Sequence, residues 1–483
     1  MSLPVDALTT LFSLSVLTAT KGNASKRLIP AWGDHRPVKD PQHTLGISAG
    51  YIEHVALAGL TGFRDLLQHL TSQQALVHGI PIGSTPGEVF ELVVAKQFTG
   101  AHGTIARTKA CFQYPPGPHL LMLDRDPEAE PVATAEELMR HMARALPAFA
   151  GVGWLATSST SSAIRCKKTG AWLRPPDGWH IYLLVTGNVE RFRDLLKVRL
   201  WLAGHGFCKL ATPNQQTGVC AVLERALVDL SVFSPERLDY VAGALIHEDA
   251  PFYQDRPAPE LHAGGVLDVD AFPDITDEER AQYATLVAEA KERLAPERRA
   301  KVHAHITTVT PALPEAEVEQ EITARLDRME RAVLEPTHLL YFVKGVGIPA
   351  EALCGPEGKK RDGKRLADPQ EPTYRQGDDA VFHWNQGDWR ITSWAHGVQT
   401  TYQLTHPEPE LPLTDDEDMT DLLARVSATT QPGQALAADT PRIVRKEQII
   451  ISTDISGVGG EMIRTIMRLP PPRGSSSVRT NSL

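Results

Sequence analysis

The sequence has few cysteines and no long apolar segment. Its five cysteines stand at scattered positions and include no Cys-x-x-Cys pair. This pattern argues against a disulfide framework and against a zinc site, because zinc ligands usually come in closely spaced pairs. No uncharged run approaches the about 18 residues of a membrane span, and the apolar opening at residues 8–19 has no basic leader. These absences predict a cytoplasmic protein with no membrane partner.

An excess of basic residues is also missing. Lys and Arg number 49 against 59 Asp and Glu, which gives a formal net charge of −10. A histone-like coat on nucleic acid is therefore excluded, although a local basic groove is not. With 42% apolar and 22% charged residues, the composition is that of a globular protein, and the length of 483 residues predicts two or three domains.

Apolar strands and amphipathic helices follow one another along the first half of the chain. Continuous apolar runs predict buried strands at residues 118–126 and 179–185. Amphipathic spacing predicts helices at 53–70 and 189–202, and a capping box at Thr134 starts another helix. These elements predict the fold class α+β.

Two carboxylates, Asp124 and Asp126, stand at the end of the first of these strands. Side chains alternate along a strand, so residues two apart point to the same face. Paired carboxylates repel one another unless a cation lies between them, and their oxygens are the ligands that Mg²⁺ and Mn²⁺ prefer. The alternative is a strand that runs out into an acidic loop.

Three further features accompany the acid pair. The hydroxyl-rich loop 158–162, SSTSS, is followed by two lysines and suits an oxyanion such as phosphate. His180 stands in an otherwise apolar strand, where it is either a core residue or a functional one. Asp229 lies in an apolar stretch, and a buried carboxylate needs a cationic partner, which Arg225 could supply for purely structural reasons.

In this order the features resemble the motifs of the archaeo-eukaryotic primase superfamily, most closely those of primases carried by phages, prophages and plasmids. The similar segments are LMLDRD for the first motif, SSTSSAI…GWHIYLLV for the second and LVDLSVFSPERLDYVAG for the third. The segments DPQEPTY at 368–374 and ITSWAHGVQTTYQL at 391–404 resemble the part that follows the catalytic core in phage-type primases.

The resemblance implies a DNA primase, which joins NTPs or dNTPs on a single-stranded DNA template by a two-metal mechanism with Mg²⁺ or Mn²⁺. It also implies an RRM-like antiparallel sheet packed against a smaller N-terminal α/β unit. The implied site residues are, as catalytic metal ligands, Asp124, Asp126 and Asp229 and, as nucleotide-binding residues, His180, Ser161, Ser162 and Arg225.

A path for the template is predicted on the basic helix at 189–202. Basic side chains follow phosphates, and aromatic rings stack on bases. An exposed basic face without a ligand is an equal alternative. The residues expected to contact DNA are Arg191, Arg193, Lys197 and Arg199, with Trp201 beside them.

The expected domain boundaries follow composition and the resemblance. They are an N-terminal segment at 1–24, a primase-polymerase catalytic domain at 25–250, a linker at 251–275, a C-terminal primase-associated module of helical and α/β structure at 276–405, and a linker with a largely disordered tail at 406–483. A second basic cluster at 359–365 is interpreted as a solvated loop, with contact to nucleic acid as the alternative. The sequence contains no Gly-x-x-x-x-Gly-Lys-Ser/Thr phosphate loop, so a separate replicative helicase is an expected partner.

Two other functions stay open. A non-catalytic replication or plasmid-maintenance protein could use the same fold to bind DNA, although binding alone does not need three converging acids. A metal-dependent phosphohydrolase could use Asp124 as its nucleophile. Such enzymes usually have Thr after the second Asp, whereas Pro127 stands there.

Overall fold

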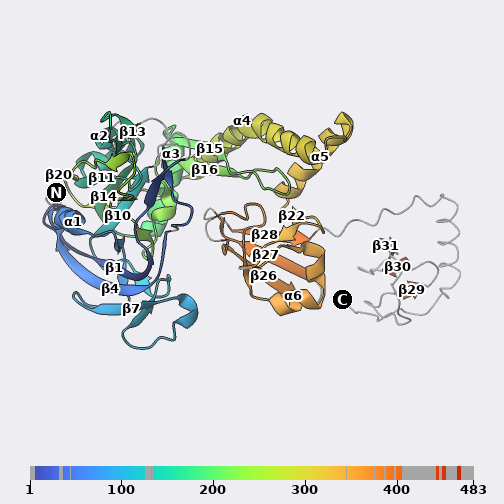
Figure 1. The fold of residues 1–483 in the computed structure, drawn as a ribbon, viewed down its shortest axis with the longest axis horizontal. Helices are drawn as coiled ribbons and strands as arrows, with labels where there is room; N and C mark the ends of the chain where they lie inside the picture. The colour runs from blue at the N-terminus through green and yellow to red at the C-terminus, as the bar shows by residue number, and fades with distance from the viewer. Residues whose placement is uncertain are drawn as a thin grey trace. The chain divides into compact units, whose positions relative to one another are not determined.

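The chain divides into two units in the computed structural model (Figure 1). Unit 1 comprises residues 1–213 and 220–305, and unit 2 comprises residues 214–219 and 306–483. The residues that the structure describes are 6–31, 36–43, 45–125, 132, 134–343, 345–374, 377–385, 388–395, 399–404, 442–444, 449–452 and 465–468.

An 11-stranded sheet is the centre of unit 1. Its strands are β1 (Leu11–Asn23), β4 (Gly46–Ala58), β5 (Gln74–Val77), β7 (Val89–Val93), β8 (Thr104–Ala106), β10 (His119–Arg125), β11 (Trp154–Ser158), β14 (Trp179–Thr186), β17 (Leu238–Asp239), β20 (Glu260–His262) and β21 (Leu267–Asp268). The main path is β20-β11-β14-β10-β1-β4-β7-β8, with β5, β17 and β21 beside it. The pairs β1–β10, β7–β8 and β14–β21 are parallel. The α+β class is confirmed, and the sheet is mixed rather than wholly antiparallel.

The two strands predicted from apolar runs, β10 and β14, lie side by side in this sheet. All residues of β10 except Asp124, and all residues of β14 except Thr186, are buried. A strand that is covered on both faces has no polar side to alternate with its apolar side. That is why both strands read as continuous apolar runs in the sequence.

Three helices of unit 1 pack against the sheet, namely α1 (Gly59–His69), α2 (Ala135–Ala145) and α3 (Val189–Leu202). Most of α4 (Asp277–Val309) also belongs to unit 1, and its Val287 and Ala290 pack against Trp201 of α3. The predicted helix at 189–202 is confirmed as α3, and the Thr134 hydroxyl accepts a hydrogen bond from the Glu137 N–H at the start of α2. Phe63 of α1 contacts Tyr182 of β14, with ring centroids 4.8 Å apart, so α1 covers the face of the sheet that carries Tyr182.

The helix predicted at 53–70 is wrong in its first third. Residues up to Ala58 belong to strand β4, and α1 begins only at Gly59. Ile52 and His54 are buried while Tyr51 and Glu53 are exposed, which is the two-residue period of a strand.

The boundaries of unit 1 differ from the expected catalytic domain at both ends. Within the expected N-terminal segment 1–24, the apolar residues form β1, which pairs with β4, β5 and β10. Within the expected linker 251–275, three short strands pair with strands of unit 1. Proline and glycine are frequent in that segment, but they do not prevent strands of two or three residues at a sheet edge.

Shorter strands form small sheets elsewhere in unit 1. They are β2 (Arg27–Pro30), β3 (Pro37–Lys39) and β18 (Leu245–Ile246); β6 (Ile80–Pro81) and β9 (Phe112–Gln113); β12 (Ile164–Cys166), β13 (Trp172–Arg174) and β19 (Phe252–Gln254); and the hairpin of β15 (Gly206–Leu210) and β16 (Val222–Ala226).

Unit 2 contains a five-stranded sheet in the order β22-β28-β27-β26-β25. Its elements are α5 (Glu315–Glu330), α6 (Pro356–Arg361), β22 (Val333–Leu334), β23 (Leu339–Leu340), β24 (Ile348–Pro349), β25 (Arg365–Leu366), β26 (Ala380–Asn385), β27 (Asp388–Ser393) and β28 (Thr400–Leu404). The first three residues of the basic cluster 359–365 form the last turn of α6 rather than a loop. The expected disordered tail at 406–483 lies mostly outside the described residues. The part of the tail that the structure describes consists of β29 (Arg442–Val444), β30 (Ile449–Ser452) and β31 (Thr465–Arg468), which form a sheet.

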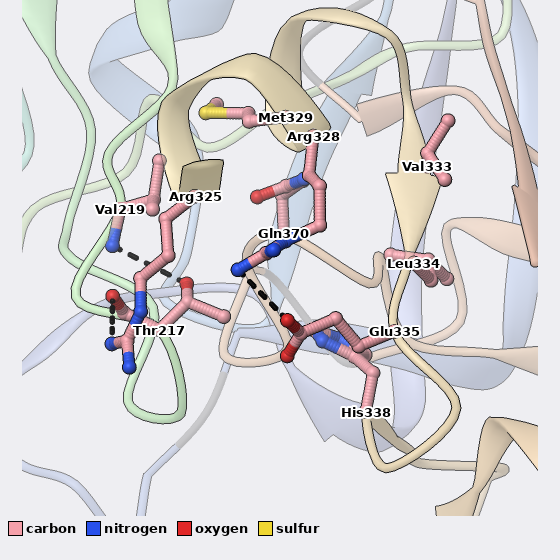
Figure 2. A pocket seen from close by; sticks show the side chains of 10 residues that line it. All are labelled: Thr217, Val219, Arg325, Arg328, Met329, Val333, Leu334, Glu335, His338 and Gln370. Carbon is pink, nitrogen blue, oxygen red and sulfur yellow. Dashed lines mark hydrogen bonds and ion pairs between the residues drawn. The ribbon is translucent and has the colours of Figure 1, made fainter. Parts of the chain in front are cut away.

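Figure 2 shows a small pocket in unit 2, between α5, β22 and the neighbouring loops. Its cavity volume of about 20 Å³ is room for about one water molecule. Arg325 donates to the Thr217 carbonyl at 2.9 Å, and Arg328 forms an ion pair with Glu335 at 2.8 Å. This pocket is too small for a nucleotide. Among the helices that the structure describes, none combines the length and the apolar composition needed to cross a membrane.

Candidate active site

The register of β10 on β14 brings Asp124 beside His180. The two residues are paired directly across the strands, so their side chains share one face of the sheet. His180 Nε2 lies 3.6 Å from Asp124 Oδ1. On the other side of β14, Thr157 of β11 is paired with His180. An acid, an imidazole and a hydroxyl therefore stand in one row across three neighbouring strands.

Asp229 joins this row through the backbone. It forms an isolated antiparallel bridge with Asp124, and its N–H donates to the Asp124 carbonyl at 2.7 Å. The Asp229 carboxylate accepts hydrogen bonds from the N–H and the hydroxyl of Ser231, at 2.8 and 3.0 Å, at the start of the 3₁₀ turn Leu230–Val232. Two of the three predicted metal ligands are therefore neighbours. The third, Asp126, lies outside the described residues.

Behind His180 lies a buried acid that sequence reasoning did not single out, Asp239 of β17. His180 Nδ1 is 3.3 Å from Asp239 Oδ1, and His78 Nε2 is 3.3 Å from Asp239 Oδ2. The Tyr182 hydroxyl donates to Asp239 Oδ2 at 2.6 Å. We call Asp239, His180, His78 and Tyr182 the Asp239 cluster. All four residues are buried, and His180 extends from the cluster to Asp124.

The charges within the Asp239 cluster stabilise one another. Burial opposes ionisation of Asp239, but the hydrogen bonds and charges of His180 and His78 outweigh it and hold the pKa of this carboxyl well below its ordinary value. Burial acts to lower the pKa of His180, yet Asp124 and Asp239 together raise it above its ordinary value. A protonated His180 held between two carboxylates is the arrangement that these directions favour.

The hydroxyl-rich loop 158–162 follows β11 and is held firmly. Arg256 donates to the Ser158 carbonyl at 2.7 Å, and the Ser162 hydroxyl donates to the Ser159 carbonyl at 2.9 Å. The Ser161 carbonyl accepts a hydrogen bond from Arg174. Ser161 and Ser162 thus belong to a loop that follows β11, the strand paired with β14, and their contact with a nucleotide stays a prediction.

Arg225 lies on β16, opposite Phe207 in the hairpin. Its guanidinium donates to the Glu224 carbonyl at 3.0 Å. No hydrogen bond or ion pair joins Arg225 to Asp229, both of which the structure describes. The contacts that hold Asp229 come instead from Ser231 and the Asp124 backbone.

The basic residues of α3 are paired with acids, three of them with acids from other segments of unit 1 and Arg193 with an acid of α3 itself. Arg191 pairs with Asp274, Arg193 with the adjacent Asp194, Lys197 with Glu224 at 2.8 Å and Arg199 with Glu279 at 2.8 Å. Trp201 is buried. The pairs of Arg191, Lys197 and Arg199 join α3 to neighbouring segments, and contact of this helix with DNA stays a prediction.

Within the described part of the chain, one group of three acidic or histidine side chains has ligand atoms within 4.8 Å of one another, namely Glu136, Glu260 and His262 at the β20 edge of the sheet. Asp124 and Asp229 do not form such a group with a third described residue. Their carboxylates are nevertheless oxygen donors of the kind that Mg²⁺ and Mn²⁺ prefer. The binding of either ion stays a prediction.

The sequence carries a signal for Asp239. Like Asp229, it is an acid between apolar residues, Leu238 and Tyr240. The same cost of burying a carboxylate that singled out Asp229 applies to it. His78 offers no comparable signal, since a histidine after an apolar run is common in cores.

Comparison of the chain with protein-family models, with curated proteins and with solved structures gives no match.

Proposed function

We propose that this chain is a DNA primase of a phage, prophage or plasmid replication system, related to the archaeo-eukaryotic primases. The observation that carries the proposal is the meeting of Asp124, Asp229 and His180 from three separate segments of the chain. These are the residues to which the resemblance assigns metal and triphosphate contacts. Asp124 and Asp229 are half-buried and His180 is buried, and taking such groups out of water is costly in a fold that only has to be stable.

Asp124 and Asp229 are the described residues that would hold a divalent cation, with Asp126 as the third. Such an ion, when bound, supplies positive charge to the phosphates and lowers the pKa of an attacking hydroxyl. His180 would donate a hydrogen bond from Nε2 to a phosphate oxygen. Its ring orientation is set from behind, because Nδ1 faces Asp239.

Primer synthesis on single-stranded DNA tests this proposal. Wild-type protein with Mg²⁺ or Mn²⁺ and labelled nucleotides is expected to make dinucleotides and longer products. Asp124→Ala and Asp229→Ala should each reduce the rate by about 100-fold or more, since a lost metal ligand removes several kcal/mol of transition-state stabilisation. Asp65→Ala removes an exposed acid of α1, 59% exposed, and should leave the rate unchanged.

The outcome also separates the proposal from the alternatives. A wild-type protein that binds single-stranded DNA but makes no product with either metal would be a non-catalytic DNA-binding protein. A phosphoryl adduct trapped on Asp124 would identify a phosphohydrolase. Unchanged synthesis in Asp124→Ala would contradict the assigned site even if the chain is a primase.

A further inference from the structure

The three-stranded sheet β13-β12-β19 carries an exposed row of aromatic and basic side chains. Arg165 of β12 is paired with Trp172 of β13 on one side and with Tyr253 of β19 on the other. Residues directly opposite one another in antiparallel strands point to the same face. Trp172 is 39% and Tyr253 is 40% exposed. We call these three residues the Trp172 row.

Arg165 holds the centre of the row in place. Its guanidinium lies 3.6 Å from the centroid of the Trp172 ring. It also donates to the Asp255 carboxylate at 2.7 Å and to the Gly170 carbonyl at 2.8 Å. The Trp172 ring therefore keeps a defined orientation while much of its surface faces solvent.

The opposite face of the same sheet is buried. Ile164 and Phe252 are fully buried in a core cluster with Leu28 and Ala250. The exposure of Trp172 and Tyr253 is thus not a consequence of loose packing. Large rings that project from a firmly packed sheet into solvent mark a surface for interaction.

Hydrogen bonds connect the row to the candidate active site. Gln254, the last residue of β19, donates to two carbonyls of the loop 158–162, at 2.9 and 3.0 Å. Arg256 donates to the Thr157 hydroxyl at 3.1 Å. Thr157 is in turn paired with His180. The Trp172 row and His180 therefore belong to one hydrogen-bonded part of unit 1. A polymer bound to the row would be held in a fixed position relative to His180.

The hairpin that carries Trp172 is basic. The sequence contains no Asp or Glu between Glu137 and Asp177. The basic residues of the hairpin are Arg165, Lys167, Lys168 and Arg174, and both lysines are exposed. The Lys167 ammonium donates only to a backbone carbonyl, that of Glu248, at 2.8 Å. Exposed aromatic rings can stack on unpaired bases, and basic groups beside them can bind the phosphates of the same strand.

We propose that the Trp172 row binds single-stranded DNA, with bases stacked on Trp172 and Tyr253 and phosphates near Lys167 and Lys168. A single strand fits better than a duplex, because the bases of a duplex already stack on each other and do not present their faces. That the bound strand is the template rests on the proposed function, whereas binding by the row does not.

Fluorescence anisotropy with a labelled oligo(dT) of about 20 nucleotides, in EDTA and without nucleotide, measures this binding apart from catalysis. Trp172→Ala and Tyr253→Ala should each raise the Kd about tenfold, and Trp172→Phe should raise it much less because it keeps a ring. The matched controls Trp394→Ala and Tyr51→Ala remove rings that are 46% and 52% exposed elsewhere. They should leave the Kd within about twofold.

Two further measurements separate stacking from charge. An abasic oligonucleotide of equal length should bind the wild-type protein about tenfold more weakly than oligo(dT). The double variant Lys167→Ala/Lys168→Ala should reduce the slope of log Kd against log salt by about 1.4, because each single-strand phosphate contact contributes about 0.7. Equal affinity for the two oligonucleotides, wild-type affinity in Trp172→Ala, or an equal loss in Trp394→Ala would each overturn the proposal.

The two proposals can fail separately. Tight, Trp172-dependent binding without primer synthesis would support DNA binding by the Trp172 row and contradict the proposed primase activity. Primer synthesis together with wild-type binding in Trp172→Ala and Tyr253→Ala would support the primase activity and contradict DNA binding by the row.

Discussion

Two acidic clusters of unit 1 are built from similar parts. In the Asp239 cluster the carboxylate meets two histidines and a tyrosine hydroxyl. In the second, which we call the Glu224 cluster, Glu224 of β16 meets Lys197, Lys291 and the hydroxyl of Tyr283. The side chain of Asp239 is 1% exposed and that of Glu224 is 26% exposed.

The difference between them lies in the basic partners. An imidazole has two nitrogens, so His180 can face Asp239 through Nδ1 and Asp124 through Nε2. A lysine ammonium is the end of its side chain: Lys291 contacts Glu224, and Lys197 contacts Glu224 and the ring of Tyr283, both within the Glu224 cluster. The Asp239 cluster thus orients a group at the candidate site, whereas the Glu224 cluster ties α3, β16 and α4 together.

The largest effect on stability is expected from Asp239→Asn. Removing one charge of a buried, paired group costs about 3–5 kcal/mol of the free energy of unfolding, because the remaining partners stay buried. Urea denaturation measures this loss, with Asp65→Asn as the exposed control, which should change stability by less than about 0.5 kcal/mol. A loss below about 1 kcal/mol would mean that the Asp239 cluster stabilises no more than a surface pair.

A smaller loss, of about 1–2 kcal/mol, is expected from Glu224→Gln, because the cluster is partly exposed and solvent weakens its ion pairs. Burial acts to raise the pKa of Glu224, but hydrogen bonds from Lys197, Lys291 and Tyr283 outweigh it and lower the pKa to about 2. A lowered carboxyl pKa stabilises the fold above the ordinary value of 4.5, and this stabilisation is lost as the pH falls through about 2.

The pH profile of that variant follows from the sign of the shift. The difference in unfolding free energy between wild type and Glu224→Gln should be constant from about pH 7 to pH 5 and should shrink between pH 4.5 and about 2. A difference that grows on acidification would contradict the assigned contacts.

The smallest effect concerns DNA and Lys197. Because its ammonium is paired with Glu224 at 2.8 Å, Lys197→Met should change the affinity for oligo(dT) by no more than about twofold. The same anisotropy measurement, with the double variant of Lys167 and Lys168 for comparison, tests this. A loss of fivefold or more would support the template path predicted along α3 and would mean that the pair opens when DNA binds.

Several parts of the fold could be predicted from the sequence. Strands β10 and β14 and helix α3 were confirmed because burial and amphipathic spacing are local patterns within each segment. The first third of the helix predicted at 53–70 is wrong because residues up to Ala58 belong to β4, where a period of two appears in the burial of the side chains. The ion pairs of Arg191, Lys197 and Arg199 could not be predicted, since their acidic partners Asp274, Glu224 and Glu279 lie in other segments of the chain.

The candidate site also has a part that the sequence predicts and a part that depends on the tertiary structure. Asp124, Asp229 and His180 can be recognised in the sequence as polar residues in apolar surroundings. Burying such a group costs free energy unless it has a partner, so its presence there points to a structural or functional role. That they meet depends on pairings between distant segments, β10 with β14 and Asp124 with Asp229. Asp239 reaches His78 only because β17 pairs with β5. Hydrophobic burial is a property of each segment, whereas the partner of a charge is a property of the assembled sheet.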